Sequence, residues 1–237
     1  MYGTRARLGI LVPSANTITE EEFNALKPDG VSVHAARMFI THPTAENLAR
    51  MAEDTERATK MIATLGPSVI AFVCTTGSLL SGIGWDEELI NRIEKIAKVP
   101  ATTTATAVIR AFKELGVTKV SVGTPYNEEL NKMEADFFES SGIKVLDLKG
   151  LDLTPEEMNQ LALERVMELA REVDKPDAEA VFLSCTNLKA LPIIEQLEKE
   201  LKKYVFSSNV ATFWDAIRML GIKQRIIGKG MLLEGLA

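Results

Sequence analysis

The two cysteines of the chain occur in the same local context, and their chemistry is the clearest signal in the sequence. Cys74 follows the apolar run 69–73 and precedes Thr-Thr-Gly-Ser, while Cys185 follows the run 180–184 and precedes Thr-Asn. Short apolar runs of this kind are typical of strands buried on both faces of a parallel sheet. Because ligands of open parallel sheets bind beyond the carboxyl ends of the strands, each thiol is expected to face a ligand.

Two thiols on opposite sides of a planar carbon could act as acid and base, or as nucleophile and acid. The thiolate is the reactive form, and its ordinary pKa of about 8.5 must be lowered. A helix beginning directly after each cysteine would lower it through its N-terminal amides and dipole. The same amides, with the hydroxyls of Thr75, Thr76, Ser78 and Thr186, could hold carboxylate or enolate oxygens. The structural alternative is that both are buried packing residues, as free cysteines usually are; the repeated context favours chemistry.

Hydrophobic patterning places these cysteines in an α/β chain. Strands are predicted at 8–13, 31–38, 69–73, 119–125, 143–148, 180–184 and 204–208, with a short strand or loop at 101–104. Helices are predicted from Glu20, at 44–65, 85–99, 105–115, 127–140, 155–173, 192–203 and 210–220, with Thr154 as an N-cap and Gly116 as a C-cap. Alternating strands and helices indicate a parallel sheet.

The second half of the pattern repeats the first. Pro13 and Pro125, each at the end of a strand, are 112 residues apart, and the two cysteines are 111 apart. We therefore expect two pseudo-symmetric α/β halves, residues 1–117 and 118–237, with the active site between them. The strand ends of facing halves would then bring both thiols to one cleft.

Composition excludes several classes of protein. The net charge of −6 over 237 residues argues against nucleic-acid binding, and no run of about 18 apolar residues predicts a membrane span. The N-terminal residues lack the apolar core of a signal peptide, so a cytoplasmic protein with free thiols is expected. Neither histidine has ligand spacing and no Gly-rich dinucleotide fingerprint follows the first strand, so no metal or organic cofactor is expected. A homodimer is left open.

The sequence resembles the aspartate/glutamate racemase superfamily, and within it the maleate cis–trans isomerase and arylmalonate decarboxylase branch. The resemblance rests on segments spread over nearly the whole chain, namely 12–17, 74–78, 123–126, 184–188, 207–214 and 218–221. The arylmalonate decarboxylases share this layout but keep only the second cysteine and carry glycine at the first. The presence of both cysteines, with Asn16 and Asn187, is more similar to the isomerases.

The resemblance implies a role for each matching residue. Cys74 would be the nucleophile or base and Cys185 the acid on the opposite face. Asn16 and Tyr126 would bind one carboxylate, and the remaining contacts to carboxylate or enolate oxygens would come from Thr75, Thr76, Thr186 and Asn187. Structural alternatives stand beside these roles: Asn16 could start a helix, Tyr126 could be a buried aromatic residue, and Thr75 and Thr186 could be N-caps. Asn209 and Trp214 are expected to be structural.

The expected activity is cofactor-independent cis–trans isomerisation of a small enedioate, of the maleate-to-fumarate type. One departure concerns residues 151–156, which lead directly into a helix where isomerases usually carry a longer loop with a substrate-binding asparagine. That contact is expected to be missing, which bears on the identity of the substrate. The alternatives are an amino-acid or arylmalonate racemase or decarboxylase, and a small-carboxylate binding protein without turnover.

Overall fold

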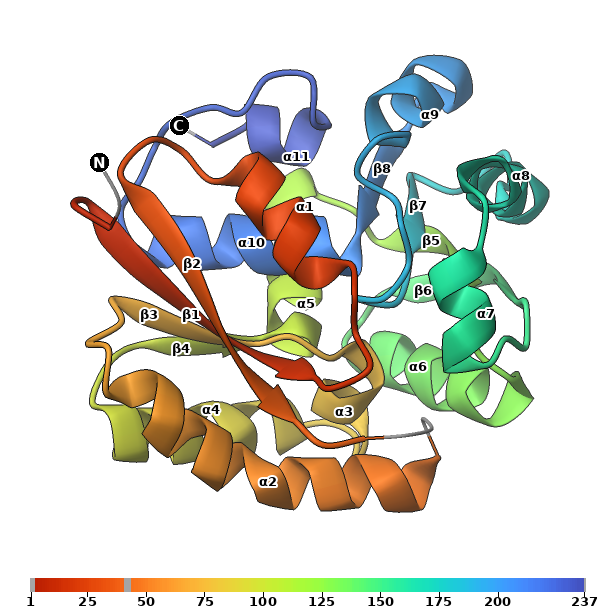
Figure 1. Ribbon diagram of the computed structural model, residues 1–237. Coiled ribbons are helices and arrows are strands. Elements are labelled where there is room, and N and C mark those ends of the chain that lie inside the picture. The colour runs from red at the N-terminus through yellow and green to blue at the C-terminus, as the bar shows by residue number, and fades with distance from the viewer. Residues whose placement is uncertain (1–2, 41–43, 237) are drawn as a thin grey trace.

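The fold consists of two four-stranded parallel sheets, one from each half of the chain (Figure 1). The computed structural model describes residues 3–40 and 44–236. The strand order is β2-β1-β3-β4 in the first sheet and β6-β5-β7-β8 in the second. All pairings are parallel, and the two orders are the same when each strand is matched to its counterpart. The predicted α/β class and the pseudo-symmetric arrangement of sheets are therefore confirmed.

The strands lie close to their predicted positions. They are β1 (Ala6–Pro13), β2 (Val31–Met38), β3 (Val69–Phe72), β4 (Ala101–Thr103), β5 (Lys119–Thr124), β6 (Lys144–Gly150), β7 (Ala180–Leu183) and β8 (Tyr204–Ser207). Every residue of β3 and β7 is buried, as expected for central strands covered on both faces.

The helices of the first half are α1 (Thr19–Leu26), α2 (Ala45–Ala63), α3 (Thr75–Leu79), α4 (Trp85–Ala97) and α5 (Thr104–Leu115). Those of the second half are α6 (Glu128–Ser140), α7 (Pro155–Gln160), α8 (Leu163–Val173), α9 (Ile194–Leu201), α10 (Ser208–Met219) and α11 (Met231–Glu234). Thr154 caps α7 in a reciprocal capping box, and Gly116 ends α5 in the left-handed conformation, as the sequence predicts.

Two predictions about helices are wrong, and one helix was not predicted. The helix predicted over 155–173 is broken at Leu161 and Ala162 into α7 and α8. The apolar side chains of the two parts point to different places: Met158 of α7 lines a pocket, while Leu169 of α8 packs on β5 of the sheet. The break between α7 and α8 lets both be buried. No helix begins directly after Cys185, where the chain makes a turn instead, and α11 has no counterpart in the prediction.

The two halves exchange the helices that follow their fourth strands, α5 after β4 and α10 after β8. Phe112 of α5 packs edge-to-face against Phe182 and Phe206 of the second sheet, although α5 follows the first. Phe213 of α10 packs in the same way against Phe23 of α1, and α10 also contacts β3 and β4. In Figure 1, α5 and α10 lie together in the middle of the molecule. Each half therefore depends on the other for its core, and the division at residues 117 and 118 remains a proposal about sequence repeats.

Candidate active site

A single pocket contains all eight residues that the sequence analysis proposed for the site. It is lined by both cysteines, by Asn16, Thr75, Thr76, Tyr126, Thr186 and Asn187, and by Pro13, Ala15, Ile40, Leu48, Pro155 and Met158. The enclosed volume is about 70 Å³. Both halves of the chain contribute, and the turns after β3 and β7 meet at this pocket.

Cys74 lies directly after β3 and at the start of α3. Its sulfur is within 4.0 Å of the Thr76 hydroxyl and accepts a hydrogen bond from the Gly77 N–H group. A side chain on Gly77 would meet the Cys74 sulfur and the end of Met51, so glycine permits this close approach. Burial raises the pKa of the Cys74 thiol to about 11, and the two hydrogen bonds act against that rise without cancelling it.

Cys185 lies after β7 in a backbone conformation that L-residues rarely adopt, with φ of 114°. Its sulfur accepts hydrogen bonds from the Asn187 N–H group at 3.3 Å and from the Tyr126 hydroxyl. Burial raises the pKa of Cys185 to about 12, with further contributions from Cys74 and Glu134. The expectation that helix dipoles lower both thiol pKa values is therefore wrong for the protein without ligand, because desolvation of the thiolate dominates.

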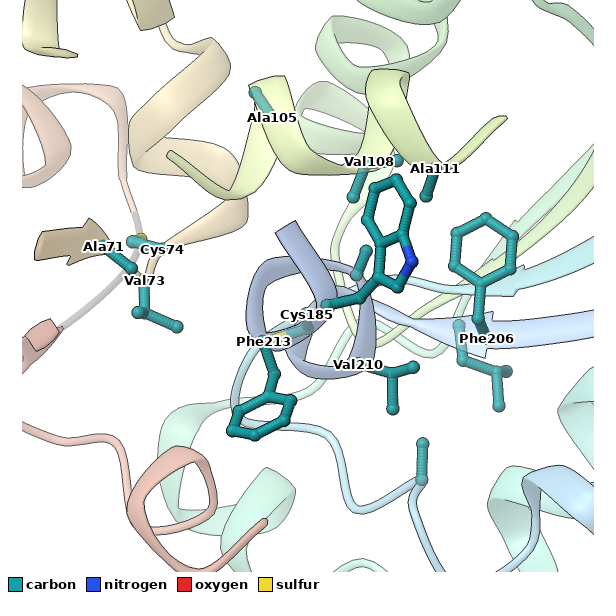
Figure 2. Close-up of a cluster of buried hydrophobic side chains, with 14 of the residues drawn as sticks. Ala71, Val73, Cys74, Ala105, Val108, Ala111, Cys185, Phe206, Val210 and Phe213 are labelled. Atoms are coloured by element: carbon teal, nitrogen blue, oxygen red, sulfur yellow. The ribbon is translucent and has the colours of Figure 1, made fainter. Parts of the chain in front are cut away.

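Ser208, the first residue of α10, connects the two cysteine turns. Its hydroxyl oxygen accepts a hydrogen bond from the Thr75 hydroxyl at 2.9 Å and another from the Cys185 N–H group at 3.0 Å. Figure 2 shows both cysteines at one cluster of buried side chains from α5 and α10. No sequence signal marks Ser208 as part of the site, because serine is common at helix starts for capping alone.

Asn16 is both part of the pocket and part of the start of α1. Its Oδ1 accepts hydrogen bonds from the N–H groups of Ile18 and Thr19, while its Nδ2 donates to the hydroxyls of Thr19 and Thr186. The N-cap of α1 is Ile18, so Asn16 is not the helix cap that the alternative supposed, although its Oδ1 binds the first N–H groups of the helix. A substrate carboxylate would have to replace one of the two Nδ2 bonds.

The turn after Cys185 is held by residues of both halves of the chain. The Thr17 N–H group donates to Asn187 Oδ1, and the Thr19 hydroxyl and Asn209 Nδ2 both donate to the Thr186 carbonyl. Asn209 is structural, as predicted, but its position next to the turn means that it also fixes the site. Thr186 is not an N-cap, since no helix follows it.

The other wall of the pocket is apolar and was not predicted. It is formed by Pro13, Ile40, Leu48, Pro155 and Met158, which come from β1, the end of β2, α2 and α7. None of the pocket-lining residues carries a positive charge. Apolar residues in amphipathic segments give no sequence signal that separates a pocket wall from the core.

Asn159 of α7 lies next to this wall. Its Oδ1 accepts hydrogen bonds from the Thr17 hydroxyl at 2.9 Å and from Asn187 Nδ2 at 3.0 Å. α7 is therefore fastened across the boundary between the halves. No asparagine from 151–156 lines the pocket. The absence of the substrate contact that isomerases make from this segment stays a prediction.

The residues described by the structure form no group of three or more His, Cys, Asp or Glu side chains that could hold a metal ion. His42 lies outside the described residues. Within residues 3–40 and 44–236, no helix has the length and apolar character needed to cross a membrane. Both cysteines are free thiols.

Comparison with known proteins gives the family. The family model described as arylmalonate decarboxylase matches residues 8–233. This chain belongs to the arylmalonate decarboxylase family. A maleate isomerase of Alcaligenes faecalis is 29% identical, with 97% of this chain and 96% of that protein aligned. The arylmalonate decarboxylase of Bordetella bronchiseptica is 26% identical over 90% of each chain.

Solved structures of the family have the same fold. The maleate cis-trans isomerase of Nocardia farcinica, in a mutant with a covalently bound succinylcysteine intermediate, superimposes with a TM-score of 0.93 at 26% identity, covering 97% of this chain and 98% of that one. A mutant of arylmalonate decarboxylase in the liganded form gives a TM-score of 0.90 at 26% identity, covering 96% and 98%. The resemblance stated from the sequence is confirmed, and the chain is an enzyme of a family that includes isomerases and decarboxylases.

Proposed function

We propose that this enzyme isomerises a small cis-enedioate, of which maleate is the simplest, to the trans isomer without a cofactor. The observation that carries the proposal is the position of two free, buried cysteines at equivalent strand ends that line one pocket. Support also comes from related maleate isomerases, one of which has been solved with a succinylcysteine. Because its relatives are enzymes, the binding-protein alternative is not retained.

In the proposed mechanism, Cys74 is the nucleophile. Its sulfur lone pair forms a C–S bond to one alkene carbon. The π electrons of the double bond form a C–H bond between the other alkene carbon and the proton of the Cys185 thiol. The C–C bond is then single and rotates. Cys185 takes the proton back, the C–S bond breaks, and the trans alkene leaves. Covalent catalysis thereby replaces rotation about a double bond with steps of lower barrier.

Burial keeps the Cys74 thiol protonated in the free protein. Its proton is proposed to pass to a substrate carboxylate as the C–S bond forms, and to return to the sulfur when that bond breaks. The Gly77 N–H and the Thr76 hydroxyl are positioned to stabilise the thiolate once it forms. Asn16, Tyr126, Thr75, Thr186 and Asn187 are proposed to bind the substrate carboxylates through their hydroxyl, amide and backbone groups. These assignments follow their place in the pocket.

Decarboxylation of an arylmalonate is the second candidate. The apolar wall, with Leu48 and Met158, would suit a hydrocarbon substituent better than a second carboxylate. Racemisation of an amino acid, with the cysteines as two bases, stays a further alternative. A cytoplasmic location and a homodimer also stay predictions.

One assay separates these reactions. The enzyme is incubated in D₂O with maleate, phenylmalonate or an amino acid, and products are followed by NMR and by release of carbon dioxide. Formation of fumarate supports the proposal. Carbon dioxide with one solvent deuterium in the product would establish the decarboxylase, and inversion with α-deuterium exchange would establish the racemase.

A further inference from the structure

Behind the cysteine turns, Glu134 of α6 has a fully buried carboxyl group. Its Oε1 accepts one hydrogen bond, from the Ser184 hydroxyl at 2.6 Å, and its Oε2 has no partner. An ionised carboxylate with a single hydrogen bond and no neighbouring cation is costly to bury. Burial accordingly raises the pKa of Glu134 to about 7.

Glu22 of α1 shows what a buried carboxylate in this fold requires. Glu134 follows Glu22 by 112 residues, the separation that also relates Pro13 to Pro125. Glu22 is buried too, but it accepts hydrogen bonds from the N–H groups of Ala190 and Leu191 and from Asn209 Nδ2. It fastens the first half to the segment that follows Cys185.

Glu134 lacks such partners for a reason in the sequence. Asn209 is the second residue after the N-cap Ser207 of α10, and the corresponding residue after the N-cap Thr103 of α5 is Ala105. The amide that satisfies the first glutamate therefore has no counterpart for the second. The two equivalent glutamates differ in that only Glu134 has an oxygen without a partner.

The groups that interact with Glu134 belong to the proposed active site. The negative charge of ionised Glu134 raises the pKa values of Tyr126 and Cys185, whose side chains hydrogen-bond to each other. The charge of a Cys74 thiolate in the opposite turn also raises the pKa values of Tyr126 and Cys185. Ser184, which donates to the carboxyl, is bonded through its backbone to Cys185.

The elements packed against α6 supply no cation to balance this carboxyl. α3 contains no ionisable side chain. On α5, Arg110 pairs with Asp215, and Lys113 and Glu114 are exposed. On β6, Asp147 and Lys149 pair with Lys175 and Glu172 at the surface.

We propose that Glu134 is a positioning residue that holds its proton throughout the reaction, so that Cys185 can alternate between thiol and thiolate. The inference rests on the proposed function. When Cys185 gives its proton to the substrate carbon, the electron pair stays on sulfur and creates a buried thiolate. A neutral Glu134 permits that charge, and the Asn187 N–H group, which donates to the Cys185 sulfur, stabilises it. An ionised Glu134 opposes it by repulsion, so proton transfer from Cys185 weakens as pH rises through about 7.

The test measures alkylation of Cys185 by iodoacetamide, resolved from Cys74 by peptide mass, in the wild type, Glu134→Gln and Glu22→Gln. Glutamine keeps a carbonyl oxygen for Ser184 and cannot ionise. At pH 8.5 the Cys185 of Glu134→Gln should react about tenfold faster than that of the wild type, because a carboxylate charge has been removed. At pH 6, where the wild-type carboxyl is neutral, the two rates should agree within about twofold.

Glu22→Gln is the matched control, since Glu22 is buried at the equivalent position and is absent from the groups that act on either thiol. Glutamine loses one of the bonds that Glu22 accepts, so the Cys185 rate itself can change, but the ratio of that rate to the wild-type rate should be the same at pH 6 and at pH 8.5. Infrared titration of the wild type should show a neutral carboxyl band that disappears between pH 6 and 8.5 and is missing from Glu134→Gln. The comparison with the variant separates this band from that of Glu198, whose pKa burial also raises to about 7. Two results would overturn the inference. One is an equal rate of Cys185 alkylation in Glu134→Gln and the wild type at pH 8.5, and the other is a wild-type infrared spectrum in which this carboxyl band does not appear. Failure to turn over maleate would count against the proposed function and would leave these results standing.

Discussion

The Thr75 hydroxyl and the Ser208 hydroxyl share a hydrogen bond of 2.9 Å that joins the turn of Cys74 to the turn of Cys185. Thr75 directly follows the first cysteine, and the same Ser208 oxygen accepts the backbone N–H of the second. One residue at the start of α10 thus bonds to both turns. Its counterpart in the first half, Thr104, bonds to Phe72 and Thr212 instead. The Thr186 hydroxyl, which donates to the Val73 carbonyl at 3.4 Å, is a second link between the turns.

Ser208→Ala should lower activity by about tenfold and stability by about 1–3 kcal/mol, because a buried hydroxyl and a buried N–H lose their partner. Ser207→Ala is the matched control. It removes only the N-cap bond to Val210, which costs about 1 kcal/mol of stability and leaves the cysteine turns intact. Steady-state kinetics and urea unfolding of both variants measure the effects. Equal losses of activity in the two would show that Ser208 acts only as a helix residue.

The two buried thiols should make the protein sensitive to alkali. Burial raises the pKa of Cys74 to about 11 and of Cys185 to about 12, both above the ordinary pKa of a thiol in the unfolded chain. Unfolded thiols therefore lose protons first, and stability present below pH 9 is lost as pH rises toward 11 and 12. At pH 10.5 the loss should be about 2 kcal/mol for each thiol. Urea unfolding of wild type and a Cys74→Ser, Cys185→Ser double variant at pH 8 and 10.5 measures it. The same pH dependence in both proteins would contradict these thiol pKa values.

Much of this arrangement could be predicted from the sequence, because it follows from local patterns. The runs before Cys74 and Cys185 fix two central strands, and ligand sites lie at strand ends in such sheets. The repeat then places the two ends at equivalent positions. What the pattern could not give is which residues from distant segments meet there. Ser208 and Asn159 contact the site only because α10 crosses to the other half and α7 turns away from α8.

The protonation state of the cysteines was also beyond the sequence. Helix starts near a cysteine favour the thiolate, but the degree of burial decides whether desolvation outweighs them. Cys185 further departs from expectation because its positive φ replaces a helix by a turn. A non-glycine residue in that conformation is held by surrounding bonds, here from Ser208 to its N–H group and from Thr19 and Asn209 to the Thr186 carbonyl.

Met158→Ala should distinguish the two substrate classes that the pocket could accept. Met158 is 4% exposed and belongs to the apolar wall, so alanine enlarges the pocket without touching the cysteines. For an enzyme that takes maleate, kcat/KM should fall by about tenfold or less, while a methyl-substituted maleate should gain relative to it. Competition between the two substrates in one assay measures that ratio. If the wild type does not turn over maleate, and Met158→Ala loses most of the wild-type activity on phenylmalonate, the result would favour the decarboxylase.

Removal of metals should leave activity unchanged. The described part of the chain has no cluster of metal-ligating side chains, and the proposed chemistry needs only thiols and hydrogen-bond donors. The enzyme is dialysed exhaustively against EDTA and assayed with and without added divalent ions. Loss of turnover that one of those ions restores would refute a cofactor-independent mechanism.

Mass analysis of a Cys185→Ser variant incubated with maleate tests the central claim most directly. Without the Cys185 sulfur that takes the proton back from the substrate carbon, release of the adduct should slow and the covalent intermediate should accumulate, as the succinylcysteine in the related Nocardia farcinica mutant illustrates. Intact-mass measurement and peptide mapping should find one added succinyl group, located on Cys74. Cys74→Ser, assayed in parallel, should carry none. Turnover of maleate by Cys74→Ser, or a succinyl group on any other residue, would contradict the mechanism.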